Sequence, residues 1–263
     1  MKRIIITGGG GYLAEQFSEH LAVRGGYDVK LLSRSPRTGK EILIADIADW
    51  NADWAGTFRN AYAIVHLAAC RTRGAPWADL QRVNVDGTLN VFEAAAQGKA
   101  RRIIYASTSR VLEGYFNSRV RWTPALSPKP VSLYSVSKSV GESIARHFAM
   151  RRGQSVVCFR VGRCHAGDDR TDIGMTMNQQ LRRLSIRDFC QAMELAIETD
   201  NIGFSLLHLA SEIPGSPWDI SETKRVLGYE PQDSYHPEAP SLKHRLSRVI
   251  RRRISRLSQS LMP

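Results

Sequence analysis

A run of four glycines, Gly8–Gly11, separates two apolar segments near the start of the chain. Before it, Arg3–Thr7 is short, β-branched and apolar, which is typical of a strand buried on both faces. After it, Tyr12–Arg24 carries apolar residues at helical spacing, and Gly25 and Gly26 close that segment. Strand, glycine turn and helix together predict the phosphate-binding unit of a dinucleotide fold, because glycines admit a pyrophosphate and a helix start supplies N–H groups. The alternative is a flexible glycine-rich turn in another kind of α/β protein.

The rest of the chain alternates between strand and helix patterns, and 263 residues suit one α/β domain. We predict a Rossmann-like, doubly wound parallel sheet with a small C-terminal substrate-binding part, as one domain over residues 1–240. Substrate is expected to bind at about residues 163–185 and 204–235. Strands are predicted at Tyr27–Ser33, Glu41–Ala45, Ala61–Ala69, Arg101–Thr108, Ser155–Val161 and Phe204–Ala210. Helices are predicted at Trp50–Arg59, Trp77–Gln97, Leu133–Arg152, Ile186–Thr199 and Asp219–Gly228, with a Pro-rich loop at Glu113–Leu133.

Tyr134 and Lys138 stand four residues apart, so they share one face of the predicted helix Leu133–Arg152. Hydride can leave an alcohol carbon only as the hydroxyl proton is removed, and a free phenol is a poor base at neutral pH. A cation one turn away, together with an oxidised nicotinamide, favours phenolate. The spacing therefore predicts Tyr134 as a general acid/base. The alternative is an amphipathic helix with an exposed Tyr and Lys.

The spacing Thr7-Gly8-x-x-Gly11-x-x-Ala14 resembles the TGxxGxxG signature of the extended short-chain dehydrogenase/reductases, the NAD-dependent epimerase/dehydratase group. Longer strings, HLAACRTRGAPW, YSVSKSVGE and RVGRCHAG among them, resemble the uronate dehydrogenases, which oxidise a hexuronic acid with NAD. This resemblance runs from Met1 to about Asp233. It implies that Thr108, Tyr134 and Lys138 are catalytic, with Thr108 holding the substrate oxygen, although Thr108 could also be a plain turn residue. The implied cofactor-binding residues are Gly8, Gly10, Gly11, Tyr12, Leu13, Asp46, Ile47, Leu67, Ala68, Ala69, Asn84, Tyr134 and Lys138.

Arg34 follows the second predicted strand, where an acid would bind a ribose 2′-hydroxyl and an Arg would accommodate a 2′-phosphate. We therefore predict binding of the cofactor NADP through Arg34, with NAD as the alternative. A solvated turn Arg is the other interpretation. Asp46 resembles the family residue that touches adenine, but it could equally cap the helix Trp50–Arg59. His66, in mid-strand, is expected to be a satisfied core histidine.

Three positions depart from the uronate dehydrogenase pattern near the substrate. Arg71, Ser109-Arg110 and Arg163 stand where that group has small or neutral residues, and Arg170 is the nearest candidate for its carboxylate-binding Arg. These residues favour a more anionic substrate, such as a sugar phosphate, a nucleotide sugar or an acidic sugar. Alternatively, the arginines pair with acids of the segment that follows, Asp168, Asp169 or Asp172.

Charge is uneven along the chain. The net charge is +12, and residues 241–263 hold seven Lys or Arg without one Asp or Glu. The apolar residues of this tail repeat at helical spacing, so it is predicted to be a basic amphipathic helix. It could lie on an anionic membrane surface, or dock on its own domain or a partner. We expect no nucleic-acid binding, because no recognisable module is present.

The four cysteines lack metal-ligand spacing and are expected to be free thiols, with no metal bound. We expect a cytoplasmic homodimer, peripheral to the inner face of the membrane through its tail. The predicted function is that of an NAD(P)-dependent oxidoreductase or epimerase acting on a sugar-like, anionic substrate. The alternative is a dinucleotide-binding redox sensor without turnover.

Overall fold

A seven-stranded sheet forms the centre of the computed structural model, which describes residues 1–237 except 38, 40, 119 and 165–174. The strand order is β3-β2-β1-β4-β5-β6-β9, and every neighbouring pair is parallel. The predicted Rossmann-like class is therefore confirmed. The strands are β1 Lys2–Thr7, β2 Tyr27–Ser33, β3 Ile42–Ile44, β4 Ala63–His66, β5 Arg102–Thr108, β6 Ser155–Val161 and β9 Phe204–Leu209.

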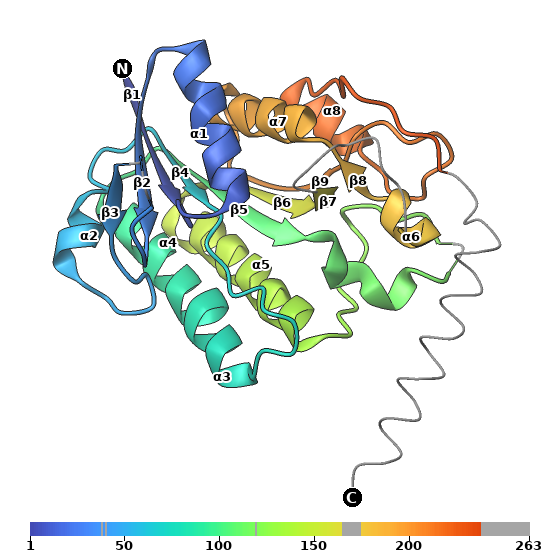
Figure 1. Cartoon of the computed structure of the whole chain (residues 1–263), viewed down its shortest axis with the longest axis horizontal. Coiled ribbons are helices and arrows are strands. Elements are labelled where there is room, and N and C mark those ends of the chain that lie inside the picture. Colours follow the sequence, from blue (N-terminus) through green and yellow to red (C-terminus); the bar gives the residue numbers. More distant parts are fainter. Residues whose placement is uncertain (38, 40, 119, 165–174, 238–263) are drawn as a thin grey trace, which may run out of the picture.

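Helices cover both faces of this sheet (Figure 1). On one face, Phe17 and Leu21 of α1 (Tyr12–Arg24) share an apolar core with Phe189 of α7 (Ile186–Glu198). On the other, α2 (Ala52–Gly56), α4 (Gly87–Gln97) and α5 (Leu133–Arg152) pack through a second core. Strands buried on both faces explain the apolar runs in the sequence. The remaining elements are α3 Trp77–Leu80, α6 Met177–Gln180, α8 Ser221–Leu227, and the short pair β7 Arg163–Cys164 and β8 Arg183–Leu184.

The C-terminal part is fastened to the segment that precedes α5. Trp122 donates its backbone N–H to Pro217, 2.7 Å away, and accepts from the Asp219 N–H at 2.9 Å. The rings of Trp122 and Trp218 lie 6.0 Å apart and pack in a small third core with Val111. This joint holds residues 210–220 beside the sheet's carboxyl edge.

Three predicted elements differ in the structure. The predicted helix Trp77–Gln97 contains a π-helical segment, Gln81–Asp86, whose wider turn lets both Val83 and Asn84 face inward. The predicted helix Trp50–Arg59 is only the five-residue α2. The predicted loop at Glu113–Leu133 overlaps a 3₁₀ helix, Ser109–Tyr115, which Thr108 caps.

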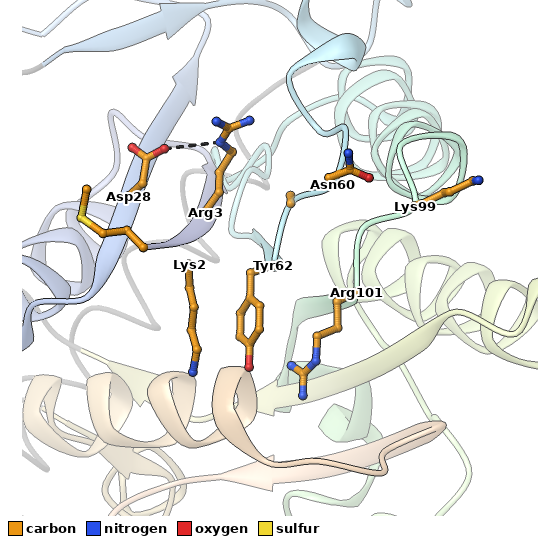
Figure 2. A pocket seen from close by; sticks show the side chains of 9 residues that line it. Lys2, Arg3, Asp28, Asn60, Tyr62, Lys99 and Arg101 are labelled. Carbon is orange, nitrogen blue, oxygen red and sulfur yellow. Dashed lines mark hydrogen bonds and ion pairs between the residues drawn. The ribbon is translucent and has the colours of Figure 1, made fainter.

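A cavity of about 520 Å³ lies at the amino edge of the sheet (Figure 2). The Tyr62 ring stands between Lys2 and Arg101, whose cationic groups lie 4.7 and 4.5 Å from its centroid. Lys2 pairs with Glu198, while Arg101 donates to the Ile197 carbonyl at 3.0 Å. Both cations thus contact the carboxyl end of α7, where positive charge is favourable. They therefore anchor a helix, and the cavity is remote from the predicted site residues.

Candidate active site

The glycine turn forms a cradle in which the backbone packs too closely against its neighbours for side chains to fit. A Cβ atom on Gly8, which has φ +74°, would lie 2.8 Å from the Ala68 amide nitrogen, and one on Gly10 would lie 3.1 Å from the Ser33 hydroxyl. Gly11 is the N-cap residue of α1, so no side-chain cap can cover the first turn of that helix. The geometry fits a dinucleotide pyrophosphate, which would meet backbone N–H groups and the positive end of the helix dipole.

A cavity of about 650 Å³ runs along the carboxyl edge of the sheet, from this cradle to the start of α5. Most of the predicted site residues line it: Gly8, Gly10, Gly11, Tyr12, Leu13, Arg34, Asp46, Ile47, Leu67, Ala68, Ala69, Arg71, Thr108, Tyr134 and Lys138. Asn84, Ser109, Arg110 and Arg163 do not belong to its lining. The topology thus brings residues from six segments of the chain to one groove, as expected at the carboxyl ends of parallel strands.

Two arginines border the end of the cavity that lies at the glycine turn. Arg34 is exposed directly after β2. Arg37, which also lines the cavity, donates to the Gly10 carbonyl at 3.0 Å and pairs with Glu15 at 2.9 Å. Arg37 therefore ties the segment after β2 to the glycine turn and to α1.

Asp46 is not the cap of α2, because Asn51 accepts the capping hydrogen bond from Asp53. One Asp46 carboxylate oxygen instead accepts from the Ala48 N–H at 3.0 Å. The other pairs with Arg82 of the π-helical segment, also at 3.0 Å. The carboxylate is thus held in a fixed orientation at the cavity wall.

Tyr134 occupies the first turn of α5, next to a dense capping network. Ser132 caps the helix in a capping box with Ser135, and Glu113 accepts from both hydroxyls. Burial raises the pKa of Tyr134, while the charges of Arg71 and Arg110 and a hydrogen bond with Thr108 oppose that rise. Sequence reasoning expected the nearby Lys to be the cation that favours phenolate. In the structure, Arg71 and Arg110 are further cations that oppose the rise of the Tyr134 pKa.

Lys138 lies one turn further along α5 and is only 2% exposed. Its ammonium group is 4.2 Å from the centroid of the Tyr105 ring. Burial lowers the pKa of Lys138 to about 7, and the negative charge of Glu142 acts in the opposite direction. A group with such a pKa can change its charge near neutral pH.

Asn84 and His66 support the site from behind. The Asn84 amide accepts from the Cys70 N–H at 2.7 Å and donates to the Ser137 hydroxyl at 2.9 Å, so it joins the segment after β4 to α5. His66 bonds the hydroxyls of Thr7 and Thr88 at 2.7 and 3.0 Å, and burial lowers its pKa well below the usual range. The expectation of a satisfied core histidine is confirmed.

The remaining predicted substrate residues lie near the cavity but outside its lining. The Arg110 guanidinium is 5.7 Å from the Tyr134 ring centroid and pairs with Glu113, and Arg163 lies in β7. Ser109 is buried and accepts from Arg182 at 2.7 Å. Ser109 and Arg110 belong to the 3₁₀ helix and Arg163 to β7, and their roles at the substrate stay predictions. Sequence reasoning missed Arg182, whose pKa burial lowers to about 10.

Several predictions concern residues that the structure does not describe. Arg170 and the acids Asp168, Asp169 and Asp172 lie outside the described residues, as does the tail 241–263. Among the described helices, none has the length and hydrophobicity needed to cross a membrane.

Comparisons with known proteins identify the family of this chain. The model of the NAD dependent epimerase/dehydratase family matches residues 4–184. L-arabinose 1-dehydrogenase (NAD(P)(+)) of Haloferax volcanii is 30% identical, covering 89% of this chain and 98% of that protein. NAD-dependent glucose-6-phosphate dehydrogenase of the same organism is 28% identical, covering 88% of this chain and 93% of that protein.

A solved structure of uronate dehydrogenase from Agrobacterium tumefaciens, a mutant complexed with NAD, superimposes with a TM-score of 0.77 at 27% identity. The aligned region covers 89% of this chain and 86% of the chain in that structure. The resemblance to uronate dehydrogenases is therefore confirmed. The chain belongs to the NAD-dependent epimerase/dehydratase family, and is an NAD(P)-dependent enzyme of the sugar dehydrogenase and epimerase type.

Proposed function

We propose that this enzyme oxidises or reduces a sugar-like substrate that carries an anionic group, with Tyr134 as general acid/base. One observation carries the proposal: the cavity that begins at the glycine cradle ends at Thr108, Tyr134 and Lys138. A dinucleotide extended along that cavity would bring its nicotinamide to the tyrosine. Proton and hydride transfer could then occur at one carbon and its oxygen.

Three residues of this chain would each have a separate role in the reaction. Thr108 would hold the substrate oxygen by a hydrogen bond, and Tyr134 would take the hydroxyl proton. Lys138 would orient the nicotinamide ribose and supply positive charge one turn from the tyrosine. The bound nicotinamide would accept the hydride from the carbon. In reduction the same groups would act in the reverse order.

Cations around the tyrosine support an anionic substrate. Arg71 lines the cavity, and both Arg71 and Arg110 act on the pKa of Tyr134. Arg182 lies behind them, largely buried, and donates to Ser109. Arg71 is exposed at the cavity, and guanidinium groups match carboxylates and phosphates well. A relative that takes glucose-6-phosphate by name is in line with this charge pattern.

For the cofactor, we propose NADP(H) as the preferred dinucleotide. The support is Arg34, exposed at the end of β2 where an acid would otherwise select NAD. The L-arabinose relative is named for both cofactors, so either choice occurs among similar proteins. The segments at about 163–185 and 204–235 are proposed to cover the substrate. The homodimer and the membrane contact of the tail stay predictions.

The test is turnover by the full chain against matched sugars: glucose, glucuronate and glucose 6-phosphate, each with NAD and with NADP. We expect activity with at least one anionic sugar, and Tyr134→Phe should lose at least about 100-fold in kcat while retaining cofactor affinity. Tyr115→Phe, a substitution outside the cavity lining, is the matched control. Equal rates for Tyr134→Phe and wild type would exclude Tyr134 as the base.

A further inference from the structure

Glu142 continues the line of Tyr134 and Lys138 along α5, at a further spacing of four residues. Its side chain is buried, and three donors converge on it. The Ser107 hydroxyl donates to one carboxylate oxygen at 2.6 Å, and the Arg160 Nε donates to the same oxygen at 3.0 Å. A second Arg160 nitrogen donates to the other oxygen at 2.9 Å. Arg160 thus binds Glu142 in the bidentate geometry that is strongest for this pair.

Arg160 also reaches past the carboxylate. Its Nη1 donates to the carbonyl oxygens of Leu126 and Pro124, at 3.2 and 3.4 Å. Those residues follow Trp122, the joint to the C-terminal part. One buried guanidinium, 1% exposed, therefore connects the catalytic helix to the segment that holds the predicted substrate-binding part.

The other end of the network touches the cavity. Ser107 lines the cavity wall and directly precedes Thr108 in β5. Its hydroxyl donates to Glu142, so the carboxyl end of β5 is fixed against α5. Tyr134 and Lys138 belong to the same helix. Thr108 and Tyr134 come from different elements, and this contact holds those elements in register.

Burial makes this arrangement costly. A well-packed apolar pair is often as stable as a buried ion pair, so stability alone gives weak reason for Glu142 and Arg160. We propose that Glu142 and Arg160 are positioning residues, which set Thr108 against the tyrosine and hold residues 122–126 in place against the C-terminal part. This inference rests on the proposed function, because it assigns a reaction to the residues that are positioned.

The first experiment compares kinetic constants of the full-length enzyme. Ser107→Ala removes one contact of the network, and Glu142→Gln removes its charge. Each should lower kcat by about 10-fold or more, with cofactor Kd unchanged within about twofold, since the cradle at Gly8–Gly11 is untouched. The control is Ser143→Ala, on the exposed face of α5. If Ser107→Ala and Glu142→Gln both match this control, the positioning role is wrong.

Glu142→Gln leaves Arg160 buried without its partner and could impair folding. The double variant Glu142→Gln/Arg160→Met removes both charges and avoids that problem. We expect it to fold, with a melting temperature near that of wild type, yet to keep the kinetic defect. Full activity of the folded double variant would overturn the proposal. Arg160→Lys, with Glu142 in place, retains the positive charge but not the bidentate geometry of the guanidinium. It should therefore recover less than half of the kcat that the double variant loses.

Hydrogen exchange tests the same network without turnover. In the double variant, the Trp122 and Leu126 amides should exchange at least about 10-fold faster, while amides in α7 should be unchanged. Unaltered exchange at those two amides would refute the anchoring of residues 122–126. If wild type turns over none of the sugars while exchange responds as expected, the proposed function fails and the anchoring stands.

Discussion

A Cβ atom on Gly141 would overlap the hydroxyl oxygen of Tyr105, and it would lie 2.6 Å from the ring carbon that bears this hydroxyl. The helix α5 therefore approaches β5 more closely than any other residue at position 141 would allow. Lys138, one turn earlier, rests its ammonium on the same ring. This close contact sets the depth of α5 against the sheet.

Gly141→Ala should therefore destabilise the protein, although alanine is the better helix former by about 1 kcal/mol. Overpacking of a core typically costs about 1–3 kcal/mol, and here the neighbour is a ring that is fully buried. Urea unfolding would measure the loss. Adding Tyr105→Phe should recover part of it, because the overlapping oxygen is removed. A Gly141→Ala protein at least as stable as wild type would contradict the packing described.

Cofactor choice should depend on Arg34. Calorimetry should show NADPH binding more tightly than NADH, and Arg34→Asp should reverse the order, because an acid repels the 2′-phosphate and binds the free 2′-hydroxyl. We expect the NADPH affinity to fall by about 10-fold to 100-fold, the value of a charge-assisted hydrogen bond. Arg151→Asp makes the same charge change at the far end of α5 and serves as the control. Equal wild-type affinities for the two cofactors would exclude the NADP assignment.

Lys138 should make stability depend on pH. Its pKa is about 7 in the folded protein and near the ordinary 10.5 when unfolded. Between these values the unfolded chain binds more protons, so the free energy of unfolding contributed by Lys138 rises with pH, by at most about 1.4 kcal/mol per unit. Below pH 7 the buried Lys138 is charged, so the full free-energy cost of burying that charge is present. The stability of wild type relative to Lys138→Met should therefore increase from pH 7 to 9 in urea titrations. A constant difference would mean that Lys138 does not titrate in this range.

Local pattern was enough to predict much of this fold. The expected bounds of α1, β2, α5 and β6 are those of the structure, because glycines or a capping serine mark where those elements begin or end. The π-helical segment was missed, since apolar spacing does not distinguish one wide turn inside a helix. Arg110 and Arg163 lie outside the cavity lining, which the sequence could not show because a side chain's surroundings depend on tertiary context. Glu142 and Arg160 stand in strings that resemble the uronate dehydrogenases, but nothing in the sequence shows that they pair, because their contacts join separate elements.

Arg71 provides the sharpest test of the anionic substrate. It lines the cavity, and its charge lowers the pKa of Tyr134. Arg71→Gln should raise KM for glucose 6-phosphate or glucuronate by about 10-fold, and change KM for neutral glucose much less. Losing the cation also makes phenolate less favourable, so the acidic limb of the kcat profile should move to higher pH. Arg73→Gln, two residues away and outside the cavity lining, is the control. An equal loss of kcat/KM with charged and neutral sugars would show that Arg71 acts only on the pKa of Tyr134. The anionic group of the substrate would then need another partner.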